Sequence, residues 1–303
     1  MEDYPRTLME FEQRFISEEA CREYLFQLRW PDGFRCPRCQ HPKAWQTGRG
    51  LYHCMQCNFQ TSVTAGTIFQ DTRRPLRLWF RAMWYLTNQK HGVSALGLQS
   101  ILGLGSYRTA WTWLHKLRYA MVRPGRDRLS GIVEVDEAYL GGEKPGKRGR
   151  GAAGKALVVV AAQEDGHRIG RIRLRRVSDA SARSLGCAVQ EGVAPGTVVR
   201  TDGWRGYGPL ERLGYVHQIV RQDSYIGENL LPMVNRVVSL LRRWLLGTHQ
   251  GAVRISHLDY YLDEFTFRFN RRRSKSRGKL FYRLVQQAVA VDPMRGKSIG
   301  GYP

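Results

Sequence analysis

The chain has 303 residues, 42% of them hydrophobic and 24% charged, a composition typical of a folded globular protein rather than a disordered one. Its 48 lysines and arginines outnumber 26 acids, and a polyanionic partner, first of all nucleic acid, would explain the net charge of +22. The longest apolar run, ALVVVAA, is too short to cross a bilayer, and MEDYPRTLMEFEQRF is not a signal peptide, so we expect a cytoplasmic protein with no membrane partner.

Two CxxC pairs follow an N-terminal segment whose apolar spacing predicts helix up to the turn WPDG. The pairs are Cys36/Cys39 and Cys54/Cys57, separated by 14 residues. Four thiolates at this spacing form the tetrahedral set that Zn²⁺ prefers. Disulfides or a redox site are the alternatives, but adjacent CxxC sulfurs bridge only with strain, and nothing indicates export. We therefore predict a structural zinc ribbon built from short antiparallel strands.

A helical region follows the ribbon. The amphipathic run RPLRLWFRAMWYLTNQKHG predicts one helix, and GVSALGLQSILGLGSYRTAWTWLHKLRYAM predicts two more separated by GLGS. The last helix carries four basic or potentially basic side chains, Arg108, His115, Lys116 and Arg118. A helix pair with a glycine turn and a basic second helix is typical of a helix-turn-helix DNA-binding motif. A helical hairpin whose charges merely face solvent would show the same periodicity.

Three of the scarce acids fall in one strand-like run, GIVEVDEAYL. The two-residue period of a strand places Glu134 and Asp136 on one face and Glu137 on the other. A second β-branched run, TVVRTDGWRGY, reaches Asp202 just before a glycine turn. Because a buried carboxylate without a partner is costly, these acids require either basic side chains or a metal ion.

Two arrangements would satisfy aspartates at strand ends. In the first, a nearby arginine such as Arg200 or Arg205 pairs with each of them. In the second, Asp136 and Asp202 form an oxygen-ligand cluster suited to Mg²⁺ or Mn²⁺. Such a cluster supports phosphoryl transfer, because the metal ions activate the attacking oxygen and stabilise the leaving one. The DNA-binding features elsewhere in the chain favour the metal site.

The second half of the chain reads as strands followed by helices and a further strand, which predicts a mixed sheet with helices packed on it. GGEKPGKRGRGAAG is expected to form a cationic loop that meets phosphates, and FRFNRRRSKSRGK, with seven basic residues, to follow a DNA backbone. The predicted regions are an N-terminal helical segment at 1–34, a zinc ribbon at 35–70, a helix-turn-helix-like region at 71–124, a catalytic domain at 130–285 and a tail at 286–303.

The order of these parts resembles the DDE transposases of bacterial insertion sequences that carry an N-terminal zinc ribbon. The similar stretches are CPRC, YHCMQC, TSVTAGTIFQDTRRPLRLWF, VEVDEAYLGG, GKRGRGAAGK, TDGWRGY, LLRRWLLGTHQGAV and HLDYYLDEFTFRFNRR. The resemblance implies an α/β, RNase H-like mixed sheet with flanking helices. It also implies metal-dependent cleavage of transposon ends and transfer of the 3′-hydroxyl end into target DNA. We expect a nucleoid-associated bacterial protein that acts on double-stranded DNA as a homo-oligomer.

By position in that family, Asp136 matches the first catalytic aspartate and Asp202 the second. Many relatives have Glu at the third position, whereas LLRRWLLGTH aligns Asn235 there, as in part of the family, with Arg242 at a basic position seven residues later. Residues i and i+7 share a helix face, so Arg242 is expected to hold phosphate oxygens. An amide oxygen is a weaker metal ligand than a carboxylate. The alternative third ligands are neighbouring acids, Glu228, Asp263 and Glu264.

Two functions therefore remain open from the sequence. In the first, the ribbon and the helix pair recognise terminal inverted repeats, and the catalytic domain uses Mg²⁺ for strand cleavage and transfer. In the second, the protein is a zinc-ribbon transcription regulator whose RNase H-like domain is catalytically inactive. A hydrolase of RNA–DNA hybrids would share the fold, but it gives no reason for the N-terminal ribbon and helix pair.

Overall fold

The computed structural model describes residues 2–294 and 299, apart from residues 124, 142–154, 221–229 and 252. The expected cationic loop and Glu228 lie outside these described residues. Among the helices that are described, none is long and apolar enough to cross a membrane.

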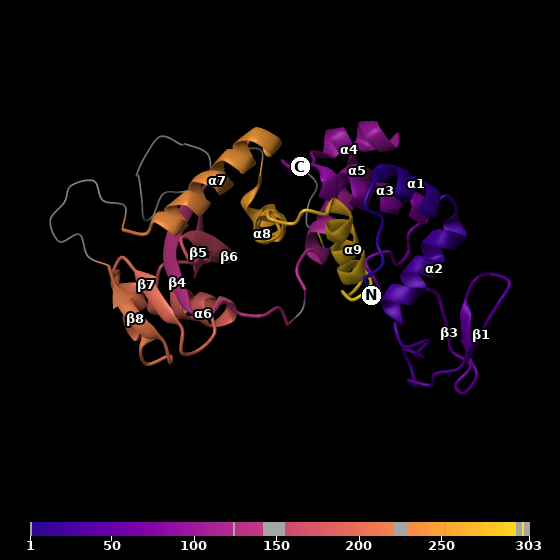
Figure 1. The fold of residues 1–303 in the computed structure, drawn as a ribbon, viewed down its shortest axis with the longest axis horizontal. Helices are drawn as coiled ribbons and strands as arrows, with labels where there is room; N and C mark the ends of the chain where they lie inside the picture. The colour runs from indigo at the N-terminus through magenta and orange to yellow at the C-terminus, as the bar shows by residue number, and fades with distance from the viewer. Residues whose placement is uncertain are drawn as a thin grey trace. The chain divides into compact units, whose positions relative to one another are not determined.

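The chain forms two compact units (Figure 1). The first comprises residues 1–124 and 274–303, and the second comprises residues 125–273. The first unit contains the last helix, α9 (Arg277–Ala288), which packs against helices α2, α3 and α5 of that unit. This differs from the sequence-based division, which ended the catalytic domain at residue 285. The physical reason is that Phe281 and Leu284 of α9 are fully buried in the first unit's core.

The first unit is mainly helical. Its other helices are α1 (Leu8–Arg14), α2 (Glu18–Arg29), α3 (Leu76–Asn88), α4 (Ala95–Leu102) and α5 (Tyr107–Ala120). Hydroxyl side chains of Thr7, Ser17 and Ser94 accept backbone N–H groups at the starts of α1, α2 and α4, which satisfies donors that the helices leave open. Aromatic rings from α1, α3 and α9 pack together at the centre of this unit. The predicted N-terminal helical segment is thus two short helices.

The ribbon consists of three short antiparallel strands, β1 (Ala44–Gln46), β2 (Tyr52–Cys54) and β3 (Gln60–Thr61). The ring of Tyr52 in β2 stacks on Phe26 of α2 and on Phe34. It also meets the ring of Trp30, the residue after α2, edge to face. Three strands of two or three residues have little core of their own. These aromatic contacts therefore supply the packing that holds the small sheet against α2.

The expected helix pair is present, but most of the basic side chains on its second helix are buried or half-buried. α4 and α5 are joined by a short turn in which Gly103 adopts a left-handed conformation. On α5, His115 and Arg118 are 0% and 2% exposed, and half-buried Lys116 donates to the carbonyl of Ile68 at 3.4 Å. Only Arg108 of the four lies exposed on the helix. Of the four side chains predicted for this helix, His115 and Arg118 are therefore not available to DNA, and the helix-turn-helix-like role of the pair stays a prediction.

The second unit is built on a mixed five-stranded sheet, as predicted. Its strands are β4 (Ile132–Leu140), β5 (Ala156–Asp165), β6 (Arg168–Val177), β7 (Val198–Thr201) and β8 (Val216–Ile219). Their spatial order is β6-β5-β4-β7-β8, with β5 antiparallel to both neighbours and β4, β7 and β8 mutually parallel. This order is the RNase H-like arrangement, and it places β4 at the centre beside β7.

Helices cover both faces of this sheet. They are α6 (Ala182–Gly192), α7 (Pro232–His249) and α8 (Leu258–Asn270), with short 3₁₀ turns η1 (Arg205–Leu210) and η2 (Ile255–His257). Side chains of β4 alternate between the faces: Ala138 and Leu140 pack with α7 and α8, whereas Val133 and Val135 pack with α6 and η1. Even-numbered residues of β4, including Asp136, therefore face the α7 side.

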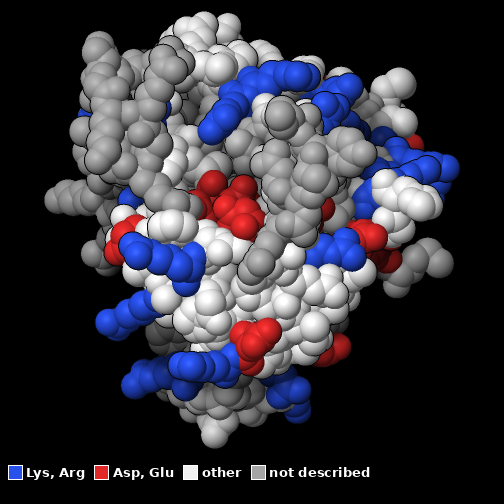
Figure 2. Space-filling model, turned by 90° about the vertical axis from the view of Figure 1, so that its left-hand side faces the viewer, with Lys and Arg blue, Asp and Glu red and all other residues white. Residues whose placement is uncertain are grey.

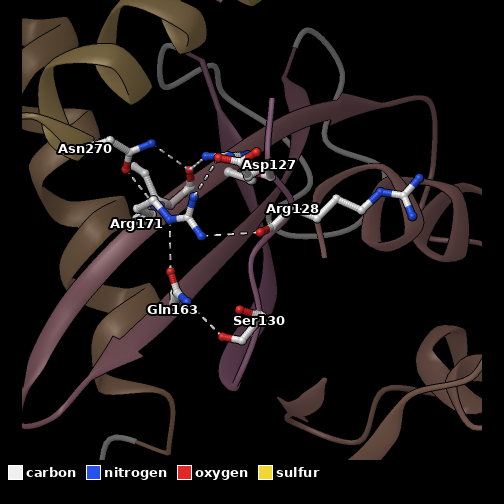
Figure 3. Close-up of polar contacts among 8 residues, drawn as sticks. Asp127, Arg128, Ser130, Gln163, Arg171 and Asn270 are labelled. Atoms are coloured by element: carbon white, nitrogen blue, oxygen red, sulfur yellow. Dashed lines mark hydrogen bonds and ion pairs between the residues drawn. The ribbon is translucent and has the colours of Figure 1, made fainter. Parts of the chain in front are cut away.

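Polar contacts hold the beginning and the end of the second unit to β5 and β6 (Figure 3). Gln163 donates to the carbonyl of Ser130 at 2.8 Å and accepts from Nε of Arg171 at 3.2 Å. Asn270, the last residue of α8, accepts from the backbone N–H of Ile172 at 2.7 Å and donates to its carbonyl at 3.2 Å. These bonds satisfy backbone groups on the edge strand β6, which would otherwise be open to pairing.

Much of the basic run FRFNRRRSKSRGK also folds back on the protein. Arg268 pairs with Glu264, whose side chain is fully buried, at 2.8 Å. Arg271 stacks on Phe267, and the Arg273 guanidinium pairs with Asp165 at 2.8 Å. The expectation that this run as a whole follows a DNA backbone is thus revised, because these arginines already have partners within the second unit.

Candidate active site and zinc centre

Asp136 and Asp202 come from adjacent parallel strands. β4 pairs with β7 in the register Ile132↔Val198, Val133↔Val199 and Glu134↔Arg200. Asp202 directly follows β7, and the same register extended by two residues would set Asp136 beside Asp202. Neighbouring strands are about 4.8 Å apart, so two carboxylates at this position are close enough to share a cation.

The phenol of Tyr207 provides a second sign that the acids lie near one another. Tyr207, in η1, is fully buried, and its hydroxyl donates to Glu137 at 2.9 Å. Burial raises the pKa of Tyr207 well above its ordinary value, and the charges of Glu137, Asp136 and Asp202 add to the effect. The phenol therefore stays protonated and holds Glu137 on the face opposite Asp136. Tyr207 is not among the site residues predicted from the sequence, although it lies in the TDGWRGY stretch, five residues after Asp202.

The turn after β7 is fixed by short local hydrogen bonds. The Asp202 carboxylate accepts from the backbone N–H of Trp204 at 2.9 Å, and the Thr201 hydroxyl accepts from that of Gly203 at 3.1 Å. The Thr201 hydroxyl also bonds to Nε2 of His217 on β8 at 2.8 Å. Gly203 has φ +81°, and a Cβ there would lie 2.5 Å from Cγ2 of Ile219. Glycine therefore suits this turn, because any other residue would have a strained backbone and would require the Ile219 side chain of β8 to move.

The arginines that could have neutralised the aspartates have other partners. The Arg200 guanidinium pairs with Glu164 at 3.1 Å, and its Nε donates to Gln218 at 3.2 Å. Arg205 lies over the ring of Trp204, 5.2 Å from its centroid. Asp202 itself is exposed and forms no ion pair with any described residue. The arrangement in which Arg200 or Arg205 occupies Asp202 is therefore not the one observed.

Glu134 explains why a buried strand carries an additional acid. It is 4% exposed, and its Oε2 accepts from the backbone N–H groups of Met233 and Val234, at 2.8 and 3.0 Å, in the first turn of α7. Burial raises the pKa of Glu134, and the two N–H groups oppose this effect in part. The first backbone N–H groups of a helix have no acceptor within the helix, and the Glu134 carboxylate serves as the acceptor for two of them. These hydrogen bonds hold the start of α7 against β4.

Asn235 and Arg242 are both exposed on α7, on the side of the sheet that Asp136 faces. Asn235 directly follows Val234, so it lies within one helical turn of the Glu134 contact. Arg242 donates to the carbonyl of Tyr139, near the end of β4, at 3.2 Å. Contacts at the two ends show that α7 runs alongside β4 in the same direction.

Two of the alternative third ligands have different surroundings. Glu264 is fully buried and paired with Arg268. Burial raises the pKa of Asp263 to about 7, and the charges that act on it are those of Arg126, Asp259 and Arg175 rather than those of the candidate aspartates. Glu264 is thus occupied by an ion pair, whereas Asp263 is only partly exposed and has charged neighbours other than Asp136 and Asp202.

Figure 2 shows one face of the second unit. Acidic side chains gather near its centre, and lysines and arginines border them. This distribution suits a metal-dependent reaction on nucleic acid, because the acids attract cations and the basic border attracts phosphates.

The donors at this centre fit a hard divalent cation. Asp136 and Asp202 offer carboxylate oxygens and Asn235 offers an amide oxygen, the ligand types preferred by Mg²⁺ and Mn²⁺. Among the described residues, the only group of three or more close acidic, histidine or cysteine ligands is that of the ribbon cysteines. The candidate set is thus two aspartates and a neutral amide, and it would bind metal more weakly than three carboxylates would.

The four cysteines of the ribbon come together as their spacing predicts. Sγ of Cys36 lies 3.6 Å from Sγ of Cys57, and the same distance separates Cys39 from Cys54. All four sulfurs lie within 4.8 Å of one another. Tetrahedral zinc with Zn–S bonds of about 2.3 Å requires S···S distances of about 3.8 Å, whereas a disulfide would be about 2.05 Å. The cluster therefore fits zinc.

Comparisons with known proteins agree with this architecture. Residues 128–270 match the ISXO2-like transposase domain, and residues 16–60 match the transposase zinc-ribbon domain. The chain belongs to this family of insertion-sequence transposases. It is also 28% identical over 277 residues to an uncharacterized protein in transposable element ISH50 of Halobacterium salinarum, a match that covers 84% of this chain and 91% of the relative. The transposase domain begins just before β4 and ends at Asn270 of α8, so it coincides closely with the second unit.

Proposed function

We propose that this transposase binds the terminal inverted repeats of its element and catalyses metal-dependent DNA strand cleavage followed by 3′-end transfer. Asp136, Asp202 and Asn235 would hold Mg²⁺ or Mn²⁺, and Arg242 would bind phosphate oxygens. The observation that supports the proposal is the β4–β7 register, whose last pair is Glu134↔Arg200; extended by two residues, it would bring Asp136 beside Asp202.

The metal, when bound, would supply activation of the attacking oxygen and stabilisation of the leaving one. The protein groups position the reacting strand. Arg242 follows the candidate ligands along α7, where a guanidinium can bridge two phosphate oxygens. Water is the first nucleophile, and the 3′-hydroxyl that cleavage frees is the second, so both steps use the same centre.

The ribbon and the helical part of the first unit would recognise the terminal repeats. The support is the cationic character of this unit: residues 72–123 contain no acid and nine lysines and arginines, of which only Arg118 is buried. Such a surface attracts duplex DNA through its phosphates.

The deciding experiment is nicking of supercoiled plasmid that carries the element ends, with Mg²⁺ or Mn²⁺ present. Asp136→Ala and Asp202→Ala should each abolish nicking and strand joining and leave binding of the terminal repeats unchanged. Arg175→Gln is the control and should cut like the parent, because it breaks an exposed ion pair with Glu191 on the α6 side of the sheet, the face opposite Asp136.

Nicking by both aspartate variants at the parent rate would refute the assignment. A parent protein that binds the repeats but never cuts under these conditions would support the alternative, a zinc-ribbon regulator with a catalytically inactive domain. Cleavage of RNA–DNA hybrids without strand joining would indicate a hybrid hydrolase instead.

A further inference from the structure

A groove of about 700 Å³ in the first unit lies outside both matched family domains. We call it the α3–α9 groove, because it lies between the end of α3, the N-terminal segment and the residues that open α9. Its lining combines three cationic side chains (Arg6, Lys275 and Arg277), three aromatic ones (Tyr4, Trp84 and Tyr85) and two amides, and it contains no acid.

The cations of the groove are available to a ligand. Arg6, Lys275 and Arg277 form no ion pair with any residue that the structure describes. Among the nearby acids, Asp3 pairs with Arg14, Glu2 pairs with Lys279 at 2.8 Å, and Glu10 accepts a hydrogen bond from the backbone N–H of Arg6 at 2.6 Å. Three unpaired positive charges around one concave surface repel one another, and an anionic ligand would relieve that repulsion.

The N-terminal wall of the groove is held firmly. The hydroxyl of Tyr24 donates to the carbonyl of Asp3 at 2.9 Å, and the rings of Tyr4 and Tyr282 lie 5.9 Å apart. At the start of α9, a Cβ on Gly278 would lie only 1.6 Å from the carbonyl oxygen of Pro5. Glycine at this position therefore permits the N-terminal segment to lie directly against α9. A preformed wall lowers the entropic cost of binding a ligand.

The groove also accounts for basic residues that have no other role. In the run FRFNRRRSKSRGK, the first four arginines contact the second unit and Lys279 pairs with Glu2, which leaves Lys275 and Arg277. On α5, the buried positions of His115 and Arg118 prevent those side chains from reaching DNA. The unpaired cations of the groove are better placed for that contact.

We propose that the α3–α9 groove binds the sugar–phosphate backbone of duplex DNA, with Arg6, Lys275 and Arg277 contacting phosphates and Tyr4 and Tyr85 packing against deoxyribose. This rests on the proposed function only in taking DNA as the ligand of the first unit. Backbone contacts carry no sequence information. The groove therefore anchors any duplex that the transposase holds, whether terminal repeat or not.

The test measures binding of full-length protein to a terminal-repeat duplex and to a scrambled duplex of equal length, over a range of salt concentrations. Arg6→Gln, Lys275→Gln and Arg277→Gln, singly and together, should weaken binding of both duplexes by the same factor. The slope of log K against log salt should fall in magnitude by about 0.9 for each phosphate that the variant no longer neutralises. Arg175→Gln, which removes one positive charge from the second unit, should leave the slope unchanged.

Three results would overturn the inference: an unchanged slope in the triple variant, a loss confined to the terminal-repeat duplex, or no DNA binding by the parent. The substitutions are at the surface, so melting temperatures equal to that of the parent establish that each variant is folded. Plasmid nicking separates this inference from the catalytic proposal. A parent that nicks while the triple variant keeps its slope contradicts the groove alone, and a parent that never nicks while the slope falls contradicts catalysis alone.

Discussion

The carboxylate of Glu134, in the central strand, accepts a hydrogen bond from the backbone N–H of Val234, in the first turn of α7, at 3.0 Å. The bond joins parts of the chain that are 100 residues apart. It fixes the helix that carries Asn235 and Arg242 against the strand that carries Asp136. A buried acid two residues before the candidate aspartate thus has a positioning role and need not touch metal or DNA.

Glu134→Ala should therefore impair catalysis through the placement of α7. It leaves two N–H donors of the helix start without an acceptor, which costs about 1–3 kcal/mol in the free energy of unfolding. Glu134→Gln keeps an acceptor oxygen and should retain most of the stability. In nicking assays, Glu134→Ala should lower kcat much more than it raises KM for DNA, with partial recovery in Glu134→Gln. Equal effects of the two variants on kcat would contradict a positioning role.

Asn235 should set the metal requirement. Asn235→Asp adds a negative charge to the candidate ligand set and should lower the Mg²⁺ concentration needed for half-maximal nicking. Asn235→Ala removes the oxygen and should raise that concentration. Arg236, the next residue on α7, is also exposed, and Arg236→Ala serves as the neighbouring control. A Mg²⁺ dependence that is identical in Asn235→Asp, Asn235→Ala and the parent would remove Asn235 from the set.

Gly203 should tolerate no side chain, for two separate reasons. Gly203 and Gly196 both have positive φ, +81° and +76°, so Ala at either position costs about 1 kcal/mol in backbone strain. Only at Gly203 would the new Cβ also meet Ile219, whereas the space at Gly196 is open. Gly203→Ala should therefore lower the melting temperature more than Gly196→Ala, and it alone should reduce nicking, because Asp202 precedes it. Matching behaviour of the two variants would show that the turn is not constrained by β8.

His217 should make stability depend on pH near neutrality. Burial lowers the pKa of His217 below its ordinary value of 6.5, although Glu211 opposes this effect. Below pH 6.5 the unfolded chain therefore takes up a proton before the folded one does, and stability falls as pH falls through this window. His217→Gln should lose less stability than the parent between pH 7 and pH 5 in thermal unfolding. A parallel decline in both proteins would argue against this contribution.

Zinc removal should unfold the ribbon selectively. Chelation, or Cys39→Ser, takes away the bonds that hold three strands of two or three residues together. We expect binding of terminal repeats to disappear and protease cleavage to appear between residues 35 and 60. Cys187→Ser, at an exposed cysteine outside the ribbon, should change neither property. Full DNA binding by the metal-free protein would show that the ribbon takes no part in it.

Local patterns in the sequence predicted those features that depend on neighbouring residues. The CxxC spacing was sufficient for the ribbon, and strand periodicity was sufficient to put Asp136 and Glu137 on opposite faces. Partners distant in sequence were not predictable in this way. The spacing of α5 shows that one face is apolar, but it does not show that the helices around it, α4 and α9 among them, bury His115 and Arg118. Likewise, no short pattern indicates that Phe281 belongs to the first unit.

The path of the chain through its two units has a practical consequence. Because α9 completes the core built by the first 123 residues, the second unit is an insertion with both its ends attached to its host. A fragment cut after residue 123 would expose the aromatic surface that Phe281 covers. A soluble DNA-binding fragment should instead be made by replacing residues 125–273 with a short flexible linker. A frameshift just before the codons of α9 should likewise damage the unit that residues 1–123 begin.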